Sequence, residues 1–150
     1  MIWIGSAPDA STNPDFETDV TSGWTFVAGI PATLTRDTST AASGSASAHV
    51  HVPVAGDFNW RVNLNTIGTI SIGDGRALSA TFWARSSAPR TLPVVVGVAG
   101  VGEVARRTVD LTTEWRRHQV ELMPRGAGSA SLSFFLAGAA GDVWLDDVHF

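Results

Sequence analysis

Three groups of residues have types and spacings that could support chemistry. Asp146 and Asp147 are adjacent carboxylates, but a glycosidase needs two carboxyl groups facing one sugar, and neighbours on a strand point to opposite faces. His49 and His51 share one face of an alternating segment and could bind a metal, yet no third ligand lies near them in the sequence. We therefore favour a solvent-exposed face for the two histidines.

The third group is Gly-Val-Gly-Glu-Val-Ala at residues 100–105, which fits a dinucleotide-binding fingerprint. That fingerprint requires a following helix whose N-terminus meets the pyrophosphate. Residues 106–111 alternate like a strand, so we reject the motif. The sequence also lacks Gly-x-Ser-x-Gly and His-Glu-x-x-His. It predicts that the chain is not an enzyme.

The composition restricts the partners of the chain. The 150 residues, 44% of them hydrophobic, suit one globular domain, and we expect a monomer. Ten Arg and no Lys against 14 acidic residues give a net charge of -4 and no basic stripe, so we expect no nucleic acid partner. The longest apolar stretch, residues 94–102, is about half of a membrane-spanning helix, so we expect no membrane partner. Without Cys there is no disulfide and no thiolate metal site.

Apolar and polar residues alternate in segment after segment, as in strands with one buried face. In residues 78–85, Phe82 belongs to the apolar set, whereas Trp83 and Arg85 belong to the opposite face. We predict strands over residues 45–52, 61–65, 78–85, 93–98, 106–111, 119–122, 131–136 and 143–150. Gly, Pro and Ser clusters separate them at the spacing of sandwich strands. The sequence therefore predicts an all-β fold, an antiparallel β-sandwich of the jelly-roll type.

Three stretches resemble the carbohydrate-binding modules of families 4, 9, 16 and 22, which share a galactose-binding-like jelly roll. The first is Asn-Pro-Asp-Phe-Glu at 13–17 with Gly-Trp at 23–24. The second is residues 74–85, which end in Ser-Ala-Thr-Phe-Trp-Ala-Arg. The third joins Leu-Thr-Thr-Glu-Trp at 111–115 to Val-Trp-Leu-Asp-Asp-Val at 143–148. The resemblance places the module at residues 13–150 and leaves residues 1–12 as an N-terminal extension or linker.

The resemblance implies a structural calcium ion where the first and last strands meet. Its ligands would be the Asp15 carbonyl, the Glu17 carboxylate, the Ser45 carbonyl and the Asp146 carboxylate. Hard oxygen ligands of this kind suit Ca²⁺. The alternative is that Glu17 and Asp146 only accept hydrogen bonds from loop amides at the edge of the sheet.

The resemblance also implies a glycan site on the concave sheet, where an aromatic ring meets the apolar face of a sugar and amide or charged groups meet its hydroxyls. Trp60 has the parity of Val62 and Leu64, so either core packing or ligand contact is open to it, whereas we expect Trp24, Trp115 and Trp144 in the core. The expected ligand-binding residues are Asn59, Trp60, Arg61, Asn63, Asn65, Trp83, Arg85, Arg117, Gln119, Glu121 and Phe135.

The function that the resemblance implies is non-catalytic binding of a polysaccharide of the β-glucan, xylan or mannan type. Xylan-binding relatives carry an acid on the strand that corresponds to residues 131–138, which contain none, so xylan specificity does not transfer. The module would be extracellular, of bacterial origin, and covalently linked to a catalytic domain that it keeps near its substrate. The alternative is a structural or adhesion domain of a larger surface or phage-tail-like protein, without a sugar site.

Overall fold

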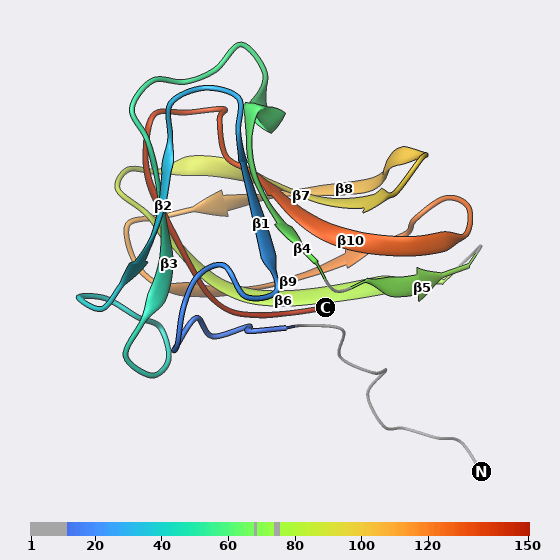
Figure 1. The fold of residues 1–150 in the computed structure, drawn as a ribbon, viewed down its shortest axis with the longest axis horizontal. Coiled ribbons are helices and arrows are strands. Elements are labelled where there is room, and N and C mark those ends of the chain that lie inside the picture. The colour runs from blue at the N-terminus through green and yellow to red at the C-terminus, as the bar shows by residue number, and fades with distance from the viewer. Residues whose placement is uncertain (1–11, 68, 74–75) are drawn as a thin grey trace.

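The computed structural model describes residues 12–67, 69–73 and 76–150, which form two packed antiparallel sheets (Figure 1). Except for Thr12, the predicted N-terminal extension at residues 1–12 lies outside the described residues. Sheet A has the order β1 (Trp24–Ala28), β4 (Val62–Thr66), β10 (Gly128–Phe135), β7 (Arg90–Val98) and β8 (Gly102–Leu111), and β5 (Ile70–Ile72) pairs with β10. Sheet B has the order β2 (Thr33–Asp37), β3 (Ser47–Val52), β11 (Gly141–His149), β6 (Leu78–Ser86) and β9 (Arg116–Leu122). The predicted β-sandwich is confirmed.

The one helical element among the described residues is a single 3₁₀ turn, η1 (Asn59–Arg61), directly before β4. No helix in the described part of the chain has the length and apolar character that crossing a membrane would need. All the strands predicted from alternation are present, with ends that differ by a few residues. The prediction missed β1, β2 and β5, because these short strands lie at sheet edges or ends and bury few of their side chains fully, so they lack a clear apolar face.

The core forms between the two sheets, from the apolar side chains that alternation assigns to one face of each strand. Phe82 of sheet B meets Phe134 of sheet A edge to face, with ring centroids 5.1 Å apart, and both are fully buried. Each such side chain contributes about 1.5–3 kcal/mol relative to an exposed one. Trp24 packs between Phe16 and Phe134 and is 4% exposed, which confirms its predicted core position. Trp115 and Trp144 are only half-buried and lie outside the core, so that prediction was wrong for both.

Strand register brings distant residues of sheet A into rows that cross the sheet. Asn65 lies opposite Ser133, Ser133 opposite Val95, and Val95 opposite Arg106. In the next row Asn63 lies opposite Phe135. These residues have the opposite parity to the core residues Leu64 and Phe134, so their side chains lie on the surface of sheet A that faces away from sheet B. We call this surface the outer face of sheet A, and its counterpart the outer face of sheet B.

Candidate functional site

The structure divides the expected ligand-binding residues between two opposite faces of the sandwich. Alternation correctly assigned outward positions to the strand residues, but their expected proximity was wrong, because β4 and β10 belong to one sheet and β6 and β9 to the other. A single ligand therefore cannot contact both groups. The outer face of sheet A and its rim carry Asn59, Trp60, Arg61, Asn63, Asn65 and Phe135; the outer face of sheet B carries Trp83, Arg85, Arg117, Gln119 and Glu121.

Two tryptophans at the outer face of sheet B and its rim, Trp144 and Trp115, make contacts within the protein. The Trp144 ring stacks on His49, with centroids 4.7 Å apart and planes 10° apart, and the Arg85 guanidinium lies 5.0 Å from the same ring. Trp144 Nε1 donates to Asp37, and Trp115 Nε1 donates to Thr40 in the loop between β2 and β3. These rings have packing partners and satisfied N–H groups, so they fit a structural role better than sugar stacking.

The two histidines also have a partner on that face. His49 Nε2 and His51 Nδ1 lie 2.7 and 2.8 Å from the same oxygen of Asp142, the second residue of β11. Burial of the Asp142 carboxyl raises its pKa, but the hydrogen bonds from the two imidazoles outweigh burial and lower the pKa overall. No set of three or more His, Asp or Glu in the described part of the chain has an arrangement suited to a metal ion. The histidines therefore join β3 to β11, which agrees with the favoured reading of an exposed face.

The outer face of sheet A presents an exposed aromatic ring at one end of β4. Trp60 is 46% exposed, although its strand parity allowed a core position. The parity argument fails because Trp60 lies in η1, where the backbone turns before the strand begins. Phe58 stacks on Trp60 at 5.4 Å with planes 11° apart, and Phe58 is itself 53% exposed. This pair is the most exposed aromatic surface among the rings expected to bind the ligand, since Trp83 and Phe135 are only half-exposed.

A chain of hydrogen bonds connects the floor of this face to the backbone of Trp60. The Ser133 hydroxyl donates to Asn65 Oδ1, and Asn65 Nδ2 donates to Asn63 Oδ1. Asn63 Nδ2 in turn donates to the Trp60 carbonyl, at 2.8 Å. Each amide NH₂ has a second hydrogen, and each amide oxygen a second lone pair, for further partners. The floor therefore offers positioned donors and acceptors beside an aromatic ring.

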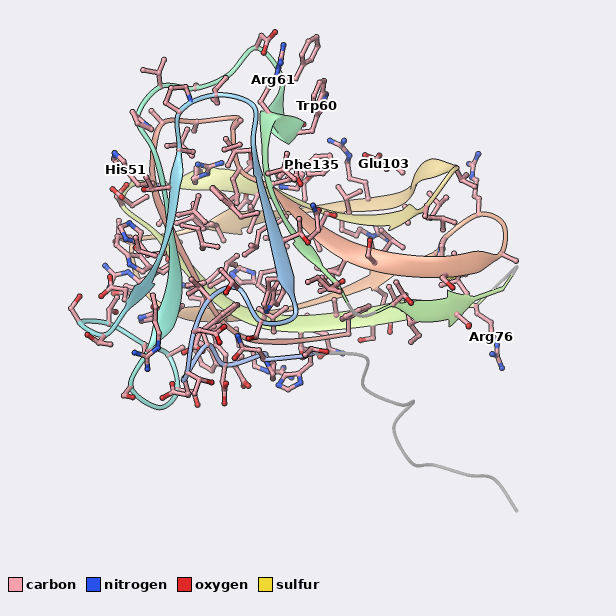
Figure 2. All side chains as sticks on the ribbon, in the orientation of Figure 1. His51, Trp60, Arg61, Arg76, Glu103 and Phe135 are labelled. Atoms are coloured by element: carbon pink, nitrogen blue, oxygen red, sulfur yellow. The ribbon has the colours of Figure 1, made fainter. Side chains whose placement is uncertain are left out.

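Two residues that the sequence did not single out complete the same face. Arg106 of β8 places its guanidinium 5.4 Å from the Phe135 ring and pairs with Glu103, with Nη2 to Oε1 at 2.7 Å. In Figure 2, Trp60, Phe135 and Glu103 project from the part of the molecule that holds η1, β7 and β8, whereas His51 lies on the other side near β2 and β3. A β-bulge between Val96 and Gly97 changes the register with β8, and no pattern in the sequence revealed which residues would lie opposite β8.

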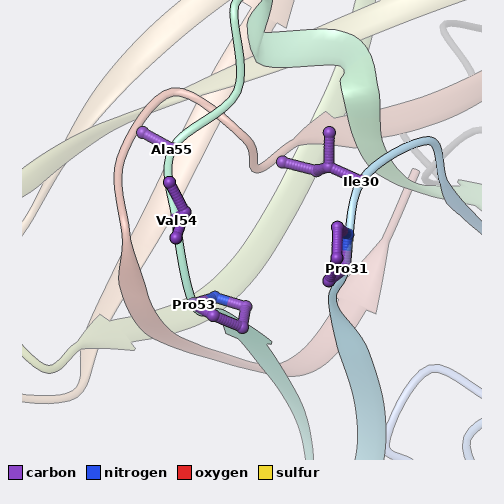
Figure 3. A pocket seen from close by; sticks show the side chains of 5 residues that line it. All are labelled: Ile30, Pro31, Pro53, Val54 and Ala55. Atoms are coloured by element: carbon purple, nitrogen blue, oxygen red, sulfur yellow. The ribbon is translucent and has the colours of Figure 1, made fainter.

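A small apolar pocket lies near the same end of the sandwich. Its volume is about 290 Å³, and its lining side chains come from the β1–β2 turn and the segment after β3 (Figure 3). None of these side chains carries a hydrogen-bonding group, so the pocket cannot orient a hydroxyl-rich ligand. The lining residues are Ile30, Pro31, Pro53, Val54 and Ala55.

The expected calcium ligands lie where the N-terminal segment meets the loop between β2 and β3. Asp146 Oδ2 accepts the backbone N–H groups of Ala42 and Ser43, each at 2.9 Å, while Glu17 accepts those of Ser45 and Ala46 and the Ser45 hydroxyl. Burial raises the pKa of Asp146 to about 6, whereas the Ser45 hydroxyl and the two amides lower the pKa of Glu17.

This donor pattern tests whether the residues fit a metal. The amides already use both lone pairs of Asp146 Oδ2, and the Asp15 carboxylate accepts the Glu17 N–H at 3.3 Å. Calcium requires 6–8 oxygen ligands around one point. In the described residues no three acidic or imidazole side chains gather to supply them, so backbone carbonyls such as those of Asp15 and Ser45 would have to contribute. The geometry therefore fits the alternative role, in which the carboxylates hold the loop through its amides. Calcium binding stays a prediction.

Comparisons with solved structures identify the fold. The chain is similar to an arabinose-bound GH51 α-L-arabinofuranosidase (TM-score 0.76, 17% identity), covering 94% of this chain and 26% of that one. It is also similar to the CBM22-1 xylan-binding domain of Paenibacillus barcinonensis Xyn10C (TM-score 0.66, 16% identity), covering 90% and 88% of the two chains. The chain has the fold of carbohydrate-binding modules.

The same fold occurs in a third match, the enzymatically active domain of tailspike protein 4 of bacteriophage CBA120 (TM-score 0.64, 19% identity), which covers 93% of this chain and 21% of that one. The chain thus spans about a quarter of the arabinofuranosidase and a fifth of the tailspike chain, but most of the isolated xylan-binding domain. No protein-family model and no curated protein sequence matches the chain.

Proposed function

We propose that the chain is a non-catalytic module that binds a polysaccharide on the outer face of sheet A. The observation that carries this proposal is the exposed ring of Trp60, whose backbone carbonyl ends a hydrogen-bonded row of Asn63, Asn65 and Ser133. The ring would stack on the apolar C–H face of a sugar, and the side chains of the row would bind its hydroxyls. Similarity to a xylan-binding domain supports the proposal.

A shallow face of this kind predicts modest affinity. Stacking and a few hydrogen bonds to a solvated ligand give only a small net free energy of binding, because association also costs the entropy of ordering the partners. Even a weakly binding module would help an enzyme to which it is joined, because it raises the effective concentration of substrate near the catalytic domain. The arabinofuranosidase match supports this arrangement, since there the similar region is about a quarter of an enzyme. We expect such a protein to act outside the cell, where its polysaccharide ligand is found.

The test is a titration of the protein with soluble oligosaccharides of xylan, mannan, cellulose and β-1,3-glucan, followed by Trp fluorescence. Pull-downs with the insoluble polymers complete the panel. We expect a saturable fluorescence change with at least one neutral glycan, because a sugar stacked on Trp60 removes that ring from water. Silence across the titrations and pull-downs would contradict the proposal.

The second candidate is a structural domain of a surface or phage-tail-like protein, and the similarity to part of a phage tailspike favours it. In that role the outer face of sheet A would contact neighbouring protein and not sugar. Silence across the whole glycan panel is the result that this candidate predicts.

A further inference from the structure

Arg106 and Glu103 of β8 form a unit with the Phe135 ring on the outer face of sheet A. Arg106 Nε donates to Glu103 Oε2 at 3.1 Å and Nη2 donates to Oε1 at 2.7 Å, so the pair is bidentate. The guanidinium carbon lies 5.4 Å from the centre of the Phe135 ring. In register, Arg106 lies opposite Val95, which is only 2% exposed although it has outward parity. Side chains therefore cover this part of the sheet.

The Trp60 ring belongs to a second unit that is built in the same way, from an aromatic ring, an arginine and a carboxylate. Arg61 Nε and Nη2 donate to the two oxygens of Asp57 at 3.0 and 3.2 Å. The Arg61 guanidinium carbon lies 5.2 Å from the centre of the Trp60 ring. Thus the Trp60 and Phe135 rings each have an arginine over them, and each of these arginines is held by a bidentate carboxylate.

Bidentate pairing determines which groups remain for a ligand. Each pair uses Nε and Nη2, so Nη1 keeps its N–H donors. Asp57 Oδ1 also accepts the Phe58 N–H, so the free lone pairs are on Asp57 Oδ2 and on the two Glu103 oxygens. Each unit therefore presents donors and acceptors side by side with no net charge. A sugar hydroxyl both donates and accepts, so it can use both partners, whereas a carboxylate or sulfate would meet a positive charge that is already neutralised.

We propose that Asp57 and Glu103 are specificity-determining residues that set this face for neutral, hydroxyl-bearing sugars and against acidic ones. The inference rests on the proposed function. The acids act by holding Arg61 and Arg106 over the rings and cancelling their charge. Without the acids, the same arginines would become binding sites for anionic sugars, with the salt sensitivity of exposed charge pairs.

The experiment compares the wild-type protein with the double variant Asp57→Asn, Glu103→Gln in binding to polygalacturonate and to its methyl ester, which share a backbone and differ in charge. We expect the double variant to bind polygalacturonate about tenfold more tightly than wild type at low salt, because two charge-assisted partners are freed. This gain should disappear at high salt, and binding to the methyl ester should show no gain.

Glu114→Gln is the control, because Glu114 lies between β8 and β9 and pairs with Arg116, at 3.8 Å, and not with Arg61 or Arg106. It raises the net charge by one, as Glu103→Gln alone does, whereas the double variant raises it by two. A general charge effect would therefore give Glu114→Gln part of the gain, and we expect none. Circular dichroism and Tm establish that each variant is folded.

The inference is overturned if wild type already binds polygalacturonate in a salt-sensitive way, if the folded double variant gains nothing, or if Glu114→Gln gains as much. These outcomes differ from failure of the proposed function, which would show as no fluorescence change and no pull-down of the wild-type protein with any neutral glycan of the panel. A salt-sensitive gain confined to the double variant supports the inference even for a wild-type protein that binds neither galacturonan.

Discussion

Replacing Trp60 by Ala tests which face of the sandwich binds sugar. Trp60 is 46% exposed, which for a Trp surface of about 250 Å² leaves about 115 Å² in contact with water. Because Phe58 and the Arg61 guanidinium both cover part of the ring, a sugar would cover roughly half of that exposed area. At about 25 cal/mol per Å² the contact contributes about 1.5 kcal/mol. We therefore expect Trp60→Ala to raise the Kd of the best glycan a little more than about tenfold.

The matched control is Trp83→Ala, the same substitution at a half-buried Trp on the outer face of sheet B. Both residues were predicted from the sequence to contact the ligand, but only Trp60 lies on the proposed face. Isothermal titration calorimetry with the best glycan of the panel would give Kd for wild type and both variants, and Tm would establish that each is folded. A large loss of affinity in folded Trp83→Ala together with an unchanged Kd in Trp60→Ala would refute the reasoning.

Three further predictions concern stability. Gly44→Ala should lower Tm more than Gly100→Ala, because both glycines have positive φ, of 64° and 80°, but only at Gly44 would a Cβ collide with the Glu17 carboxylate; equal losses would contradict this. Asp142→Asn should lower Tm at neutral pH, and the difference from wild type should shrink below about pH 4. The reason is that a carboxyl with a lowered pKa contributes stability above its ordinary pKa and loses that contribution as the pH falls through the pKa of the folded state. A Tm deficit that persists in acid would argue against the histidine contacts as its cause. Calcium binding at Asp146 predicts a higher Tm with calcium chloride than with EDTA, and identical melting curves would leave only the amide contacts.

The sequence alone determined the fold class, because period-two alternation is a local property of each strand. Phe82 and Trp83 show this, since their neighbours assign one to the core and the other to the surface, as the structure confirms. Short edge strands such as β1 and β2 have few neighbours to bury them, so their sequences carry no clear alternation. The closing Asp146 and opening Glu17 were also predicted to act at one place, and both hold the loop between β2 and β3.

Only the tertiary structure decided which outward residues share a face. Alternation reports that Asn63 and Trp83 both point outward, but the pairing of β4 with β10 and of β6 with β9 joins strands far apart in the sequence, and this places the two residues on opposite sides of the sandwich. Trp60 is exposed although alternation with Val62 and Leu64 would place it in the core, because the chain turns at η1 before β4 begins. Arg106 and Glu103 meet Phe135 only through the register of β7 between β8 and β10. Long-range pairing depends on the burial of all strands at once, so no single segment encodes it.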